Sequence, residues 1–227
     1  MKLLKPSVIA LSLLTSLSAL AQSVAIKNAT IYTSGEQGVL TNASIVFENG
    51  VITAVNPATI SADTIIDANG KVVTPGIISA LNQIGLVEVS AVSTSRDEAP
   101  KKASMTFDPS YAFNPESTLI PFARKAGITR SVVSPYSWGE TFHGQTFNVT
   151  MSSDFNSVLS TKTSMVMSFG AASTDSRATA IVELRDKLKG QKEKLAKVDE
   201  ESKEDKGSDK EPTAEEKLLT SVLNAEI

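Results

Sequence analysis

KVVTPGIISALNQIGL, residues 71–86, is the stretch of sequence that decides the fold. An aliphatic pair and a Pro-Gly step lead into a second aliphatic run, a pattern that predicts a strand beginning just after a turn. Alternate residues of a strand point to the same face, so positions 79, 81 and 83 should lie on one side of it. These positions hold Ser79, Leu81 and Gln83.

The stretch resembles the first barrel strand of the amidohydrolase superfamily, in particular its imidazolonepropionase-like, metal-dependent hydrolases. The resemblance rests on residues 72–78, VVTPGII, and residues 84–86, IGL. In the family the three alternate positions are Asp, His and His, and the imidazoles hold zinc or another divalent metal at the C-terminal mouth of the barrel. Because Ser79, Leu81 and Gln83 stand there, the resemblance implies that the first-strand His-x-His motif is replaced.

The rest of the chain offers little to replace those ligands. It contains one histidine, His143, and no cysteine. Leu81 has no lone pair, and the amide of Gln83 is a weak ligand for zinc-like ions, which prefer imidazole, thiolate or carboxylate. We therefore expect this chain to have no metal ligand, no bound cofactor and no catalytic residue, with a site made only of carboxylates left open.

Residues 1–21 have the three parts of a secretory signal peptide. Residues 1–5, MKLLK, are basic, residues 8–20 are apolar, and residues 19–21, ALA, form a small-residue cleavage site. The alternative is a membrane anchor, but ~13 apolar residues are too few for a bilayer core that needs ~20. We expect an exported protein, periplasmic or secreted, without a stable membrane anchor.

Residues 22–75 predict short strands joined by tight turns. Val24–Thr33 is one strand, and Ser44–Phe47 pairs with Val51–Val55 across an Asn-Gly turn. Two more short strands are expected at residues 65–66 and 71–73. These strands resemble those of the β-sandwich that accompanies the amidohydrolase barrel. The fold class expected is therefore α/β, with β-sandwich-type strands followed by the first part of a TIM-like barrel.

Residues 76–182 are expected to form an incomplete barrel. Asn114 is a good N-cap for a helix that ends at Gly127, and Ile128–Val133 follows as a strand. Further strands are predicted at residues 146–150 and 165–169. A complete barrel needs about 250 residues, far more than follow Gly76, so about three or four β/α units fit at most. We interpret the chain as an N-terminal portion of a longer protein, or a truncated copy.

Residues 183–227 form a charged segment of helix, linker and helix. A helix is predicted from about Arg177 through Lys197. Residues 198–211 are too polar to bury anything, which predicts a solvated linker. Thr213 and Glu216 have the spacing of a capping box, and a short helix should follow to about Asn224.

His143 and Gln145 are the candidates for contact with a substrate. They lie after a predicted strand, in a stretch that resembles a glycine-rich loop near the family's site. The alternative is that His143 is a loop histidine hydrogen-bonded locally, which the loop placement favours. Trp138 and Phe142 could line a pocket or pack on the core.

Three carboxylates near the motif strand, Glu88, Asp97 and Glu98, are the remaining candidates for a residual metal ligand or general base. The alternative that we favour is that all three are surface charges of a loop.

The resemblance implies an exported amidohydrolase-like protein that hydrolyses carbon–nitrogen bonds, peptide or non-peptide. The replaced ligands favour a second hypothesis, a non-catalytic pseudoenzyme that binds a small molecule or pairs with a homologous amidohydrolase subunit. A third is a nonfunctional truncation product. The mild net charge of −3 indicates neither a nucleic acid nor an anionic membrane as a partner.

Overall fold

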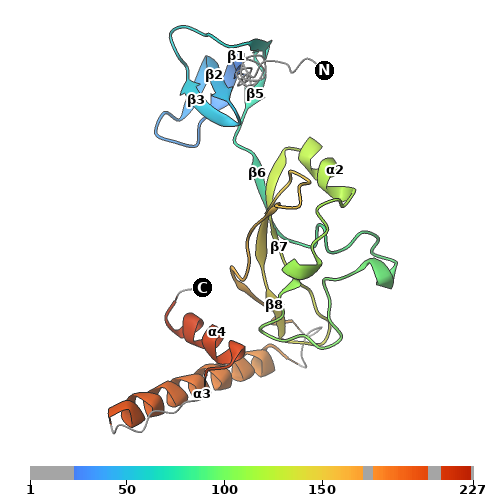
Figure 1. Ribbon diagram of the computed structural model, residues 1–227, viewed down its shortest axis with the longest axis vertical. Coiled ribbons are helices and arrows are strands. Elements are labelled where there is room, and N and C mark those ends of the chain that lie inside the picture. The colour runs from blue at the N-terminus through green and yellow to red at the C-terminus, as the bar shows by residue number, and fades with distance from the viewer. Residues whose placement is uncertain (1–22, 171–175, 204–210, 226–227) are drawn as a thin grey trace, which may run out of the picture. The chain divides into compact units, whose positions relative to one another are not determined.

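The computed structural model describes residues 23–170, 176–203 and 211–225. The signal peptide predicted over residues 1–21 lies outside them. The chain forms two compact units, with the boundary between Pro75 and Gly76 (Figure 1).

The N-terminal unit is a single five-stranded sheet. Its order is β3-β2-β1-β4, and β5 also pairs with β1. The pairs β1–β2 and β2–β3 are antiparallel, whereas β4 and β5 run parallel to β1. Asn49 and Gly50 both have positive φ, as the predicted hairpin turn requires. The strands are β1 (Ser23–Tyr32), β2 (Val39–Glu48), β3 (Val51–Val55), β4 (Thr64–Asp67) and β5 (Val72–Val73).

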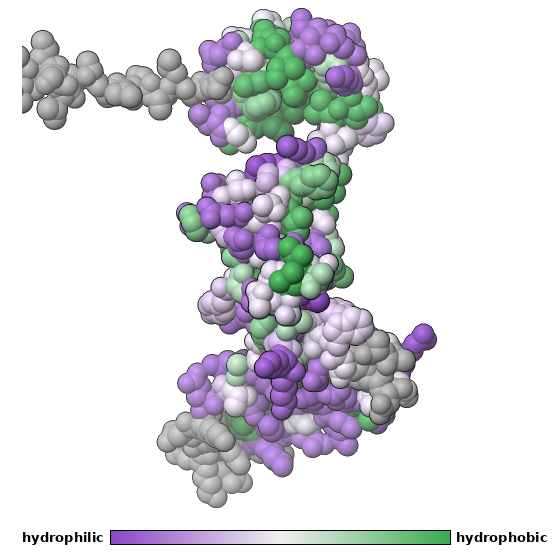
Figure 2. Space-filling view, turned by 90° about the vertical axis from the view of Figure 1, so that its right-hand side faces the viewer, coloured by the Kyte–Doolittle hydropathy of each residue, from purple (hydrophilic) through white to green (hydrophobic). Residues whose placement is uncertain are grey.

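Small and β-branched residues form the core of this unit. Ala29, Ile31, Ala43 and Ile45 are buried together. Much apolar surface stays exposed, and Figure 2 shows it gathered into a patch on this unit. The exposed aliphatic side chains of the strands are Val39, Val51, Ile52, Ile65, Ile66 and Val72.

The C-terminal unit contains a four-stranded sheet of order β10-β9-β7-β6. β6 (Ile77–Asn82) and β7 (Ile128–Val133) are parallel, and α2 lies in the connection between them. β9 (Phe147–Thr150) and β10 (Val158–Ser160) continue the sheet antiparallel. Among the described residues this is therefore one β/α unit rather than several. The chain joins β9 to β10 by a short connection, residues 151–157, which antiparallel neighbours allow.

Two further strands, β8 (Phe142–Gln145) and β11 (Met165–Met167), form a separate antiparallel pair. The predicted strands at residues 146–150 and 165–169 are confirmed by β9 and β11. β8 and β10 were not predicted.

The helix α2 (Leu119–Lys125) is shorter than predicted and begins after Thr118 rather than Asn114. Asn114 Oδ1 instead accepts a hydrogen bond from Glu116 N at 3.0 Å within a turn. A helix starting at residue 115 would place Pro121 in its interior, where proline has no N–H to donate and clashes with the preceding turn. Starting at Leu119 puts Pro121 in the first turn, where it is tolerated.

Two helices end the described chain, α3 (Arg177–Lys203) and α4 (Ala214–Leu223). α3 begins where predicted but continues through residues 198–203, so the expectation of a linker there is wrong. Opposite charges along α3 support it, as for Lys189 and Glu193, which pair at 3.9 Å. The predicted capping box of α4 is confirmed, with Glu216 N donating to Thr213 Oγ1 at 3.2 Å.

The C-terminal unit has two apolar clusters. One lies on the four-stranded sheet and includes Ile120, Val133, Phe147 and Val149. The other joins the helices to the β8–β11 pair through Met105, Phe142, Leu184, Leu188, Leu218 and Leu219. No helix in the described part of the chain is long and apolar enough to cross a membrane.

Candidate functional site

The motif strand β6 is irregular at the positions that resemble a metal site. Its pairing with β7 slips between Ala80 and Asn82, which face Val132 and Val133. Leu81 is the extra residue of this bulge, with φ of +52°. A bulge breaks the alternation of a strand. The expectation that positions 79, 81 and 83 share one face is therefore wrong.

The side chain of Asn82 forms three hydrogen bonds at the C-terminal end of β6. Its Nδ2 donates to Ser79 Oγ at 3.0 Å and to Ser131 Oγ at 2.6 Å. Its Oδ1 accepts from Ile84 N at 3.0 Å. The hydroxyl of Ser79 is thus engaged within the sheet, in a network that links β6 to β7.

Ser79 and Gln83 line a groove of about 350 Å³, together with Asn82 and Ser131. Leu81 is not part of this lining and is 65% exposed. The groove is mostly apolar, which suits an aliphatic or aromatic group better than an ion. Its apolar lining includes Ile84, Val87, Leu119, Phe122, Ile128 and Met151.

His143 and Gln145 lie on strand β8 and are buried, so their predicted placement in a loop is wrong. Gly144 between them has φ of +126°, and a Cβ there would lie 2.6 Å from Phe107 O. This close approach lets Gln145 N donate to Phe107 O at 2.8 Å. The glycine therefore fixes the position of both candidate residues.

The His143 ring packs against the side chain of Tyr136, which in turn packs against Trp138. Its centroid is 5.3 Å from that of Tyr136, edge to face, and Tyr136 is 5.1 Å from Trp138 in the same manner. Nε2 of His143 is buried without a hydrogen-bond partner in the described chain. Burial lowers the pKa of His143, and a hydrogen bond with the Glu140 backbone opposes this more weakly. The imidazole is accordingly uncharged at neutral pH.

Trp138 and Phe142 have different environments. Trp138 is 68% exposed, whereas Phe142 is buried in the cluster beneath the helices. Of the two, only Phe142 therefore packs on the core. Trp138 leaves an aromatic surface open to solvent beside Tyr136.

Glu98 is buried, so the expectation of a surface charge is wrong. Arg96 Nε donates to Glu98 Oε1 at 2.8 Å, and a second guanidinium nitrogen contacts the same oxygen. Glu98 Oε2 has no partner among the described residues. The main chain of Glu98 accepts from Tyr136 N at 3.0 Å. Tyr136 thus contacts both buried titratable residues, Glu98 and His143.

The other two carboxylates, Glu88 and Asp97, lie in different environments. Glu88 accepts hydrogen bonds from Asn114 Nδ2 at 3.2 Å and Ser117 Oγ at 3.0 Å, which anchors the turn before α2. Asp97 is exposed. Within the described ranges, no three His, Cys, Asp or Glu residues come together as a metal site. No hydrogen bond or ring contact there joins the motif residues to His143 or Gln145.

The residues that sequence reasoning missed are Asn82, Ser131 and Arg96. Asn82 and Ser131 lie on neighbouring parallel strands, a relation that the prediction of the β6–β7 pair could have revealed. Arg96 lies two residues before Glu98, and this spacing was a usable sign of a buried ion pair.

Comparison with solved structures identifies the fold. An amidohydrolase from Thermotoga maritima MSB8 is similar, with a TM-score of 0.70 and 20% sequence identity, over 88% of this chain and 55% of that one. The described chain has the fold of the N-terminal part of an amidohydrolase. It spans about half of that amidohydrolase's length, which fits an incomplete barrel.

Other hydrolases overlap with this amidohydrolase-like chain less extensively. A triazine hydrolase from Arthobacter aurescens has a TM-score of 0.35 and 18% identity over 55% of this chain and 30% of its own. A Xaa-Pro dipeptidase has a TM-score of 0.31 and 19% identity over 53% and 27%. These overlaps are too partial to bear on the fold. No known protein family and no curated protein matches the sequence.

Proposed function

We propose that this chain is the N-terminal part of an exported amidohydrolase-like protein whose first-strand metal site is lost. The observation that carries the proposal is the amidohydrolase fold combined with Ser79, Leu81 and Gln83 at the ligand positions. The reaction of the family that the chain resembles is hydrolysis of a carbon–nitrogen bond by metal-activated water. Without imidazole on this strand, the chain contributes a scaffold and substrate surface rather than the nucleophile.

A second candidate is a non-catalytic protein that binds a small molecule or a homologous amidohydrolase subunit. The bulge at Leu81 supports it, because the side chain at the central ligand position lies away from the groove that Ser79 and Gln83 line. The exposed Trp138, which packs edge to face on Tyr136, supplies an aromatic surface for such a ligand.

Metal analysis tests the loss of the site. The purified mature chain should hold far less than one zinc per chain after dialysis against zinc-containing buffer. The Leu81→His/Gln83→His variant, treated in the same way, shows how much zinc two imidazoles on this bulged strand retain by themselves, and it should also hold less than one zinc per chain. One tightly bound zinc per wild-type chain would overturn the proposal.

Activity tests the scaffold role. The same double variant should not hydrolyse dipeptides or N-acyl amino acids, because two imidazoles on a bulged strand do not complete a catalytic centre. Turnover above that of the wild-type chain would contradict this expectation.

Ligand binding separates the second candidate from the first. Trp138 is the one tryptophan of the chain, so its fluorescence reports on the surface beside Tyr136 and His143. A dipeptide that binds there should change the emission in the wild type and change it less in Tyr136→Leu, which removes the ring packed on Trp138. An unchanged emission at millimolar dipeptide would remove this surface as a binding site.

Export has its own test. When the chain is expressed with residues 1–21, the recovered protein should begin at Gln22 and be found outside the cytoplasm. Retention of Met1 in the recovered protein would contradict the signal peptide.

A further inference from the structure

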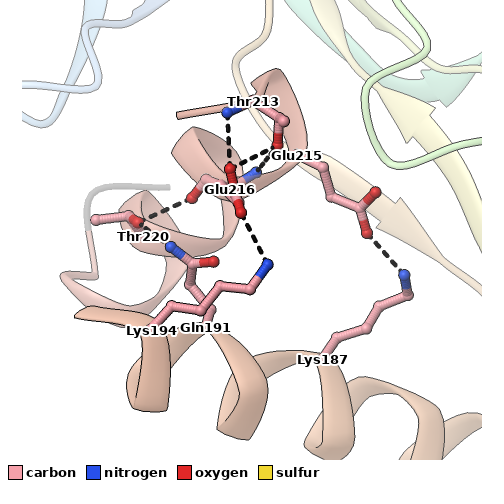
Figure 3. Close-up of polar contacts among 7 residues, drawn as sticks. All are labelled: Lys187, Gln191, Lys194, Thr213, Glu215, Glu216 and Thr220. Carbon is pink, nitrogen blue, oxygen red and sulfur yellow. Dashed lines mark hydrogen bonds and ion pairs between the residues drawn. The ribbon is translucent and has the colours of Figure 1, made fainter. Parts of the chain in front are cut away.

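Helix α4 is held on α3 by paired charges (Figure 3). Lys187 Nζ lies 2.7 Å from Glu215 Oε1, and Lys194 Nζ lies 2.8 Å from Glu216 Oε1. The two lysines are two helical turns apart and so lie on one side of α3. Two adjacent acids at the start of α4, Glu215 and Glu216, each pair with one of these lysines.

An apolar contact and one buried hydrogen bond accompany the charges. Leu218 and Leu219 are the buried side chains of α4. Gln191, itself 6% exposed, donates to Thr220 Oγ1 at 3.0 Å. The apolar partners of the two leucines come from α3, β8, β11 and the loop before β7: Met105, Phe142, Met165, Met167, Leu184 and Leu188.

The signals that make α4 a helix are carried within it. Thr213 and Glu216 form the capping box. Hydrogen bonds from Lys194 and then from Thr213 lower the pKa of Glu216 to about 2, so this acid is charged at neutral pH. A helix of ten residues is nevertheless marginal in water by itself. α4 is thus a short acidic amphipathic helix that needs an apolar, basic surface to be stable.

We propose that α4 is exchangeable, and that the α3 seat also accepts α4 from a second copy of this chain. The α3 seat consists of Leu184, Lys187, Leu188, Gln191 and Lys194. A second copy offers the same leucines and acids, so every contact of the seat is reproduced.

Two properties of the contact permit the exchange. The ion pairs are partly solvated, because the side chains of Lys187 and Glu215 are 33% and 47% exposed and those of Lys194 and Glu216 are 64% and 25% exposed. Such pairs hold weakly. Identical elements traded between copies need no new surface. Since a tethered helix competes at a millimolar effective concentration, exchange should grow with protein concentration.

Zero-length cross-linking of mixed labelled chains tests the proposal on the native protein. Chains labelled with ¹⁵N and unlabelled chains are incubated together at about 1 mM, near the effective concentration of a tethered helix, and then treated with a carbodiimide. This reagent joins a lysine to a carboxylate in contact with it. Exchange predicts linked Lys194–Glu216 peptides in which one partner is labelled and the other is not, in a proportion that falls on dilution.

The chain contains its own control. Lys189 and Glu193 pair at 3.9 Å within α3 and should link only within one copy. A Leu218→Asp/Leu219→Asp variant should lose the Lys194–Glu216 link but keep the Lys189–Glu193 link, which also shows that α3 is intact. Lys194–Glu216 links that carry a single label type at every concentration would overturn the proposal. So would the absence of this link while Lys189–Glu193 is recovered.

Discussion

Leu81 has a strained backbone conformation, and burial of its side chain does not compensate for the strain. Its φ of +52° lies in the left-handed region, and its side chain is largely exposed. That conformation costs an L-residue with a Cβ roughly 1–2 kcal/mol, whereas asparagine visits it more readily.

Replacing Leu81 by asparagine should therefore stabilise the protein. We expect Leu81→Asn to raise the free energy of unfolding by about 0.5–1 kcal/mol, since little burial is lost. Urea unfolding followed by circular dichroism measures it. Ala80→Asn, at a neighbouring exposed position with ordinary φ, is the control and should not stabilise. Equal effects at both positions would contradict the strain at Leu81.

His143 makes stability depend on pH. Burial lowers its pKa in the folded chain, so the unfolded chain, with a pKa near 6.5, binds the proton more readily. The free energy of unfolding should thus fall as pH drops below about 6.5, by at most ~1.4 kcal/mol per pH unit until the folded-state pKa is reached. Because His143 is the one histidine, His143→Gln should flatten the profile between about pH 5 and about pH 7. A variant as pH-dependent as the wild type would refute this.

Strand β8 depends on the absence of a side chain at its third residue. A Cβ on Gly144 would lie 2.6 Å from the Phe107 carbonyl oxygen, and its φ of +126° disfavours any other residue. Gly144→Ala should cost more than ~2 kcal/mol of unfolding free energy. Gly139→Ala, at φ of +78° with open space around it, should cost only ~1 kcal/mol. Thermal unfolding of the two variants compares them directly, and similar losses would argue against the crowding at Phe107.

Elements with strong local signals could be predicted from the sequence. The hairpin of β2 and β3 has an Asn-Gly turn, and α4 has its capping box. β8 could not be predicted, because FHGQ has neither alternation nor β-branched residues and pairs only through tertiary contact with β11. The start of α2 cannot be read from Asn114 alone, because a good cap does not show whether the helix that it would begin can accommodate Pro121.

The candidate site was less predictable than the fold. His143 and Gln145 could be singled out by residue type, but their burial depends on the helices and loops around β8. Glu98 was misassigned because a loop carboxylate is usually exposed, and only its ion pair with Arg96 allows burial. The bulge at Leu81 is set by the pairing of β6 with β7, which a strand pattern cannot show.

In the described part of the molecule, the edge of the four-stranded sheet at β6 is unpaired. β6 is the terminal strand of its sheet, and Ile77, Ile78 and Leu81 on it are exposed. Exposed apolar edge strands promote association between chains. Ile78→Lys should reduce self-association, seen as lower light scattering at a given concentration, because a charged edge resists pairing. Tyr111→Lys, at an apolar position 89% exposed outside the sheet, should not. Equal reductions would show that surface hydrophobicity, not the edge, is responsible.

The bulge in β6 has a consequence for any attempt to rebuild a metal centre. The bulge adds one residue to the strand, so the side chains after it no longer alternate in step with those before it. Imidazoles substituted at positions 81 and 83 would therefore not point toward one shared metal. Deleting Leu81 would remove the surplus residue and restore the alternation of the strand, but it would also remove the residue at the central ligand position, so that Asn82 would follow Ala80 there. Whether imidazoles placed on this strand can share one metal is thus a question of chain length before it is one of side-chain identity.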